Sequence, residues 1–160
     1  MNKKYLLVTI LMMIFVNIVD AQVMKVKSPC SDLKVKVVKC EESGNDVLVT
    51  LLLENIGSKD VDFSLCGGYD NYSVAIDDEG NKFSVENIKV KIGNNYYNQM
   101  FVYDKLYSEV PVKATVKISD VPEHATSFSL LSVWFNSNDW GVYGTPIKIT
   151  NLPISREGDE

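Results

Sequence analysis

The single histidine of the chain is the residue around which a nucleophilic catalytic site would have to be built. His124 lies in the polar segment 122–126, and it would need to activate Cys30, Cys66 or a serine. None of these nucleophiles lies in a sequence signature typical of such enzymes. The pattern favours a solvated loop histidine, so a small hydrolase is only the third of three functions considered.

An acidic run is the second group that could do chemistry, here by binding a metal ion. It reads Asp77-Asp78-Glu79-Gly80-Asn81. Calcium takes about six to eight oxygen ligands, usually from alternate positions of a longer loop. The run lacks that spacing and is typical of a hairpin turn in which Gly80 or Asn81 adopts a positive φ. We therefore predict a turn, no metal site and no cofactor.

Aromatic side chains gather in two segments and include the candidate binding residues. Segment 96–107 holds five of them among amide side chains, and segment 134–143 holds four. Aromatic rings beside amides suit a sugar or protein ligand, although the same rings could fill a core or cover a sheet. The candidate surface residues are Tyr96, Tyr97 and Trp140. Trp140 is expected to be the least structural, because it lies in a loop.

Residues 1–21 read as an export signal. Lys3 and Lys4 precede an apolar run over 5–19, and small residues precede a cut at Gln22. The run is shorter than the roughly 20 residues of a spanning helix, which argues against a retained anchor. Gln22 in place of a cysteine argues against a lipid anchor. We expect a soluble mature chain in the periplasm, at the cell surface or in the medium.

Removal of this leader makes the chain more acidic. The remainder has 14 basic and 20 acidic residues, a net charge of −6. This balance argues against nucleic acid as a partner. A local exception is the lysine group near the start of the mature chain, which is either a solvated strand face or a stripe that binds an anionic partner: Lys25, Lys27, Lys34, Lys36 and Lys39.

An oxidising compartment allows one disulfide among Cys30, Cys40 and Cys66. A strand between Cys30 and Cys40 would separate them by more than about 20 Å, beyond the roughly 7 Å that a disulfide spans. An up-and-down path brings Cys40 and Cys66 to the same pole. We predict a Cys40–Cys66 disulfide with Cys30 free; the alternative is three unpaired thiols.

Period-two alternation of apolar and polar residues predicts an all-β chain. Strand 46–54 is apolar on both faces and should be central, and a slip in alternation between Leu130 and Leu131 predicts a bulge or corner. The expected fold is a single immunoglobulin-like two-sheet antiparallel sandwich of about eight or nine strands over 32–154. A polar lead, 22–31, precedes it, and a disordered acidic tail, 155–160, follows it. The predicted strands are 33–40, 46–54, 60–66, 72–77, 82–92, 96–103, 110–119, 127–135 and 142–150.

Three turns give the chain a recognisable order: Asn55-Ile56-Gly57, Asp78-Glu79-Gly80-Asn81, and Val121-Pro122 before the segment 127–130. This order resembles small exported immunoglobulin-like proteins of Gram-negative gut anaerobes. The resemblance covers most of the mature chain. It implies a sandwich fold and an exported location, and it brings no active site.

These patterns together predict an exported, non-enzymatic binding module for a protein or envelope partner. The alternative is a carbohydrate-binding module that stacks sugars on Tyr96, Tyr97 or Trp140. We expect no nucleic-acid partner and no membrane span after removal of the leader.

Overall fold

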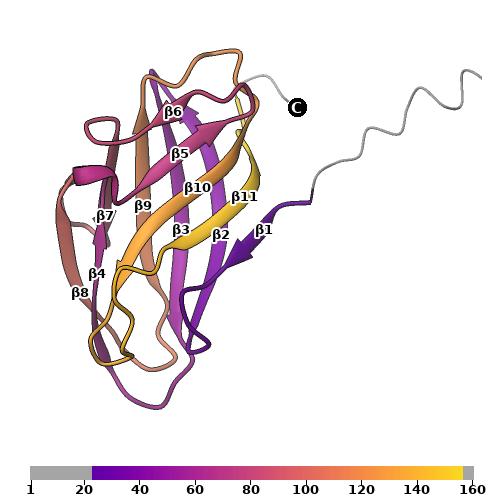
Figure 1. Cartoon of the computed structure of the whole chain (residues 1–160). Coiled ribbons are helices and arrows are strands. Elements are labelled where there is room, and N and C mark those ends of the chain that lie inside the picture. The colour runs from indigo at the N-terminus through magenta and orange to yellow at the C-terminus, as the bar shows by residue number, and fades with distance from the viewer. Residues whose placement is uncertain (1–22, 157–160) are drawn as a thin grey trace, which may run out of the picture.

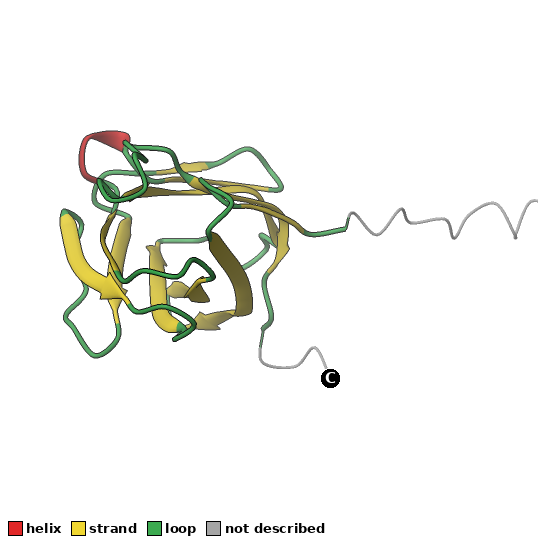
Figure 2. Ribbon diagram, turned by 90° about the horizontal axis from the view of Figure 1, so that it is seen from below, coloured by secondary structure: helices red, strands yellow, loops and turns green. Residues whose placement is uncertain are grey.

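Two antiparallel sheets pack face to face in the computed structural model of the chain, which describes residues 23–156 (Figures 1 and 2). The predicted leader, 1–21, lies outside the described residues. Between residues 23 and 156 no helix is long and apolar enough to cross a membrane. The elements of the described residues are β-strands and one short 3-10 turn, η2 (Tyr69–Asn71). The predicted all-β class is therefore confirmed.

The four-stranded sheet has the order β2-β3-β9-β7. Its strands are β2 (Leu33–Ser43), β3 (Asp46–Asn55), β9 (Val112–Ser119) and β7 (Ile88–Ile92). β3 lies between β2 and β9, as predicted from its two apolar faces. Side chains at alternate positions of β3, such as Val49 and Leu51, are fully buried between the sheets.

The seven-stranded sheet is organised around β10. Its main order is β1-β11-β10-β4-β8, and β5 and β6 extend it from β10. β10 pairs with β11 on one side; on the other it pairs with β5 along its first half and β4 along its second. The strands are β1 (Lys25–Lys27), β4 (Val61–Cys66), β5 (Val74–Asp77), β6 (Lys82–Phe83), β8 (Phe101–Leu106), β10 (Ser127–Asn136) and β11 (Ile147–Pro153).

One buried hydroxyl joins the strands where β10 changes partner. Ser73 Oγ donates to the carbonyl of Cys66, 2.6 Å away, and accepts from the N–H of Trp134 at 2.9 Å. Ser73 is fully buried, so both strand ends keep their backbone hydrogen bonds at the gap between β4 and β5.

The topology is that of an immunoglobulin-like sandwich. Taken as strands A to G, the series β2, β3, β4, β7, β9, β10 and β11 forms the sheets A-B-E-D and C-F-G. The predicted fold is therefore confirmed, and β1, β5, β6 and β8 are additions to it. A bulge or corner was predicted between Leu130 and Leu131; the register shift lies slightly earlier, between Phe128 and Leu130, and it lets both Phe128 and Leu131 face the core.

Both ends of the domain extend further than predicted. The lead contributes β1, in which Val26 pairs with Ile149 of β11. The assumed tail is also ordered at its start, because Ser155 donates to the carbonyl of Cys40 at 2.9 Å and accepts from the N–H of Glu42 at 3.0 Å. Ordered structure thus continues beyond the predicted boundary at 154, through Ser155 and Arg156, and residues 157–160 lie outside the described part.

Candidate functional site

Five aromatic side chains gather on the outer surface of the seven-stranded sheet, which we call the aromatic face: Tyr69, Tyr72, Phe101, Tyr103 and Trp134. Tyr69 belongs to η2 and Tyr72 caps its C-terminal end, while β8 supplies Phe101 and Tyr103 and β10 supplies Trp134. Tyr72 lies at the centre, with its ring centroid 5.8 Å from Phe101 and 5.5 Å from Trp134. Tyr69 and Tyr103 extend the group, 6.3 Å from Tyr72 and 6.4 Å from Phe101.

Two of these rings cover a thiol. The registers place Phe101, Cys66 and Trp134 in one row across β8, β4 and β10. Strands two apart are separated by roughly 10 Å, yet these ring centroids are 5.1 Å apart, so the rings lean together above Cys66. Cys66 is fully buried in this row, with its Sγ 3.8 Å from the Gln99 carbonyl oxygen, and this burial raises the pKa of its thiol to about 11.

Cys66 should therefore resist alkylation in the folded protein. Iodoacetamide at pH 7 should label the half-buried Cys30 first, because the thiolate is the reactive form and Cys66 is almost wholly protonated and covered. Trp134→Ala should uncover Cys66 and raise its labelling rate at least tenfold, measured by peptide mass spectrometry over time. Equal labelling of Cys66 in the parent and this variant would contradict the ring cover.

Strained backbone holds the segment that carries Tyr69 and Tyr72. Asp70 and Asn71 have φ of 49° and 60°, and the neighbouring Val85 has φ of 50°, which is rare for a β-branched residue. Gly68 forms a backbone bridge with Val85, and a Cβ on Gly68 would lie 2.2 Å from the Val85 carbonyl oxygen. Backbone in such conformations is often found at functional sites.

A polar hollow adjoins the aromatic face. Its floor continues the strand rows: Ser64 lies between Tyr103 and Asn136, and Asp62 pairs with Lys105 through a 2.9 Å ion pair. The loop after β10 closes one side of the hollow, where the Asp139 carboxylate accepts a hydrogen bond from the N–H of Asp62 at 2.8 Å. The hollow measures about 500 Å³ and is lined by Asp62, Phe63, Ser64, Tyr103, Asp104, Asn136, Asn138 and Asp139.

Tyr103 connects the two parts of the site. Its side chain is 72% exposed; it belongs to the aromatic face and also lines the hollow. A ligand on Tyr103 would meet a flat apolar ring together with carboxylate and amide groups. The arrangement can bind an amphipathic partner by stacking and hydrogen bonding.

The residues predicted as binding platforms lie elsewhere. Tyr96 is 94% exposed and belongs to none of the ring pairs among the described residues. Tyr97 covers Lys91 on the four-stranded sheet, with Nζ 4.6 Å from the ring centroid. The expectation for Trp140 is wrong: it packs against the core, and its ring stacks on Phe135 at 6.2 Å.

The predicted Cys40–Cys66 disulfide is also wrong, since all three cysteines are free thiols. The two residues lie toward the same pole but in different sheets. Cys40 is on β2, at one edge of the four-stranded sheet, whereas β4 packs beside β7 at the opposite edge. Burial raises the pKa of Cys40 to about 12, and that of Cys30 is raised as well, again chiefly by burial.

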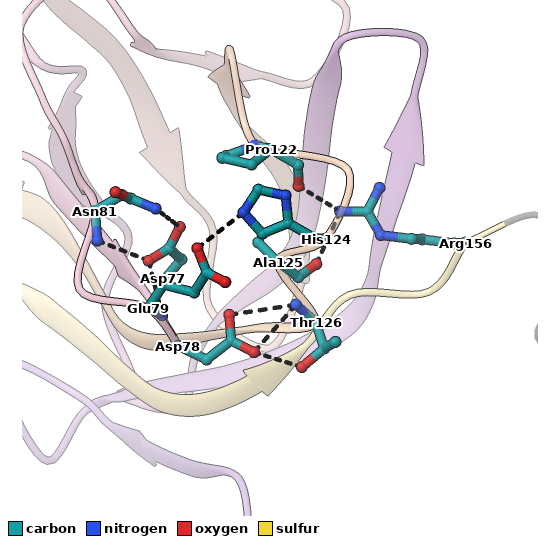
Figure 3. A network of polar contacts seen from close by, with 9 residues as sticks. All are labelled: Asp77, Asp78, Glu79, Asn81, Pro122, His124, Ala125, Thr126 and Arg156. Atoms are coloured by element: carbon teal, nitrogen blue, oxygen red, sulfur yellow. Dashed lines mark hydrogen bonds and ion pairs between the residues drawn. The ribbon is translucent and has the colours of Figure 1, made fainter.

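The acidic run forms the predicted hairpin turn (Figure 3). Gly80 has φ of 90°, and Asp77 accepts from the N–H groups of Glu79 and Asn81 at 3.0 and 2.7 Å. Its second oxygen accepts from the Asn81 amide at 2.8 Å. Asp77 is buried and serves as an internal cap for this turn.

The hairpin is tied to the link between β9 and β10. The Asp78 carboxylate accepts from the N–H and hydroxyl of Thr126, and these bonds hold the pKa of Asp78 below its usual value. His124 Nε2 lies 2.8 Å from Glu79 Oε2 (Figure 3). The predicted loop histidine is thus exposed and joined to a carboxylate, and the structure does not bring it to a thiol.

The C-terminal Arg156 holds the same link from its other side. Its guanidinium donates to the carbonyls of Pro122 and Ala125 at 2.9 and 2.8 Å (Figure 3). It also forms an ion pair with Glu42. These bonds connect the last described residue to β2 and to the β9–β10 link. We missed this role of Arg156 in the sequence, because we treated residues 155–160 as a disordered acidic tail.

Comparisons with known proteins give structural likeness only. No protein-family model matches the chain, and neither does any curated protein. Among solved structures, the ASH/PapD-like domain 7 of human CEP192 is 15% identical, with 84% of this chain and 89% of that chain covered and a TM-score of 0.40. A family 123 glycoside hydrolase from Clostridium perfringens is 11% identical, with 84% of this chain and 27% of that chain covered and a TM-score of 0.41. At these identities and TM-scores, neither structure bears on what this chain binds.

Proposed function

We propose that this chain is an exported, non-enzymatic binding module that holds a protein partner of the cell envelope on its aromatic face. The observation that carries the proposal is the gathering of five aromatic side chains on the outside of a sheet, with Tyr103 72% exposed. Tyrosine and tryptophan are the residues most enriched at the energetic centres of protein interfaces. The charged and amide residues of the adjoining hollow would form a polar rim around them.

The site is built to bind without rearranging. Phe101, Tyr103 and Trp134 project from hydrogen-bonded strands, and the strained segment fixes Tyr69 and Tyr72 against them. Side chains that are already ordered lose little conformational entropy on binding, which favours affinity.

The non-enzymatic part of the proposal rests on the state of the reactive groups. Of the two thiols considered as nucleophiles, Cys66 is buried with its pKa raised to about 11, and Cys30 is half-buried with its pKa also raised by burial. His124 lies against Glu79 in an exposed loop. The exported location rests on the leader at 1–21, and the periplasm, the cell surface and the medium all fit it.

Tyr103→Ala should weaken binding of the partner, whereas Tyr96→Ala should not. Both tyrosines are exposed, but only Tyr103 belongs to the aromatic face. The partner is first identified by crosslinking in intact envelopes and mass spectrometry. Titration calorimetry with the purified partner should then show about a thirtyfold weaker Kd for Tyr103→Ala, the size expected for an interface anchor. Equal loss in both variants, or in neither, would contradict the aromatic face as the site.

A carbohydrate ligand is the second candidate, and the hollow beside Tyr103 favours it. A sugar ring could stack on Tyr103 while its hydroxyls bond to Asp104, Asn136 or Asn138. The same variants on a glycan array separate the two functions: glycan binding lost in Tyr103→Ala and kept in Tyr96→Ala supports the sugar. A silent array beside a captured protein removes it.

A further inference from the structure

The outer surface of the four-stranded sheet is a lysine face. Residues directly opposite one another in paired strands point to the same side, so the register shows which side chains share it. Lys36, Leu52 and Lys113 form one row across β2, β3 and β9, and Lys89 stands opposite Lys117 on β7 and β9. The lysine face comprises Lys34, Lys36, Lys39, Lys89, Lys91, Lys113 and Lys117.

Carboxylates balance only part of this charge. Glu54, Glu41 and Asp46 stand on the same surface, where they form ion pairs with Lys34, Lys39 and Lys117. The remaining four lysines belong to no ion pair among residues 23–156: Lys36, Lys89, Lys91 and Lys113. The sheet surface is therefore strongly cationic, although the whole chain has a net charge of −5.

The opposite side of the sandwich carries charges of both signs. The hollow next to the aromatic face is lined by Asp62, Asp104 and Asp139, of which Asp62 is paired with Lys105. The same side also carries exposed Lys82 and Lys148, so acidic and cationic groups are mixed there, whereas the lysine face gathers seven lysines on β2, β7 and β9.

We propose that the lysine face binds the surface of an anionic lipid bilayer through its phosphate groups. The cations are spread in two dimensions, across β2, β9 and β7 and along each strand, as the phosphates of a bilayer surface are. Lys36, Lys89 and Lys113 belong to no ion pair in the described part of the chain, and Lys91 lies beneath the Tyr97 ring. All seven are lysines, which act as flexible point charges and suit diffuse attraction to many phosphates. Half-buried Leu48 and Leu52 of β3 stand within these rows, Leu52 between Lys36 and Lys113 and Leu48 beside Lys117.

This inference goes beyond the proposed function and does not depend on it. Seated on its lysine face, the domain would present the aromatic face away from the membrane, open to a partner. Lipid binding would then fix the orientation of the domain, with its aromatic face turned toward the partner.

The test compares charge variants in sedimentation with vesicles. The purified protein, its first residue established by mass spectrometry, should bind phosphatidylglycerol–phosphatidylcholine vesicles and be released by 1 M salt, where the Debye length falls to about 3 Å. Lys36→Gln with Lys113→Gln should weaken binding about thirtyfold, and the double glutamate variant should weaken it further. Both lysines are exposed, so the variants should keep the parent circular dichroism spectrum.

The matched control carries the same charge change on the other sheet. Lys82→Glu with Lys148→Glu alters two exposed lysines of β6 and β11. The vesicle affinity of this variant should stay within about twofold of that of the parent protein, because only the net charge of the molecule changes and the lysine face is kept. Equal loss in both double variants would show a net-charge effect and overturn the lysine face. Binding to pure phosphatidylcholine would overturn the electrostatic basis. Self-association in ultracentrifugation that the Lys36 and Lys113 changes abolish, without vesicle binding, would assign the face to a second copy of the chain.

Discussion

Replacing Gly68 by alanine should lower the free energy of unfolding by about 4 kcal/mol or more, an exceptional loss for one methyl group. The new Cβ would lie 2.2 Å from the carbonyl oxygen and 2.4 Å from the nitrogen of Val85. Both atoms are backbone, and the two residues form a β-bridge, so no side-chain rotation relieves the clash. The segment with Tyr69 and Tyr72 would have to move, which would also impair the aromatic face.

Gly44→Ala is the matched control for this prediction. No atom lies within 4 Å of a Cβ at Gly44, and only its φ of +64° opposes the change, at a cost of about 1 to 2 kcal/mol. Urea unfolding followed by tryptophan fluorescence measures both variants. A Gly68 variant no less stable than the Gly44 variant would show that the Gly68–Val85 contact is looser than described.

Phe135→Ala should destabilise the sandwich by about 3 to 5 kcal/mol, the range for deleting a large aromatic side chain from a core. Phe135 is fully buried at the centre of a ring stack, 5.8 Å from Phe63 and 6.2 Å from Trp140. Its loss would leave a cavity between two rings that strands and a closed loop hold in place. Thermal unfolding by circular dichroism, with urea titration for the free energy, measures the effect.

Two other substitutions establish whether burial is the cause. Phe135→Leu keeps most of the apolar volume and should lose much less stability than the alanine variant. Tyr103→Ala removes a ring from the exposed outer face and should change the free energy of unfolding by about 1 kcal/mol or less. If Tyr103→Ala were as damaging as Phe135→Ala, the aromatic face would be part of the core and not a binding surface.

Alternation along the chain was sufficient to predict the sandwich, because side chains in a strand point to opposite faces in turn. The run around Val49 and Leu51 predicted the central strand correctly, and Asp77 to Asn81 predicted a real hairpin. Strand ends were less certain: the predicted strand 96–103 begins only at Phe101, because the Asn98 backbone bonds to Val90 before β8 starts. Local patterns do not contain such long-range pairings.

The candidate site could not be predicted because it depends on which strands become neighbours. Tyr72 and Trp134 lie far apart in the chain and meet only because β10 pairs with β4 beside η2. The same reason explains the error over Trp140: we expected it to be exposed because it lies in a loop. The lysines of β2 could be recognised in the sequence as a basic group. That the lysines of β7 and β9 lie on the same surface depends on the strand pairing, which the sequence does not reveal.

The central position of β10 has a consequence for the order in which the chain assembles. β11, β5 and β4 each pair with β10, so the seven-stranded sheet cannot form until residues 127–136 have been synthesised. The β2–β3 hairpin can close early, but its apolar inner face then has no opposing layer. A chain of such non-local pairings folds slowly and leaves apolar strands open to chaperones until its last quarter is complete.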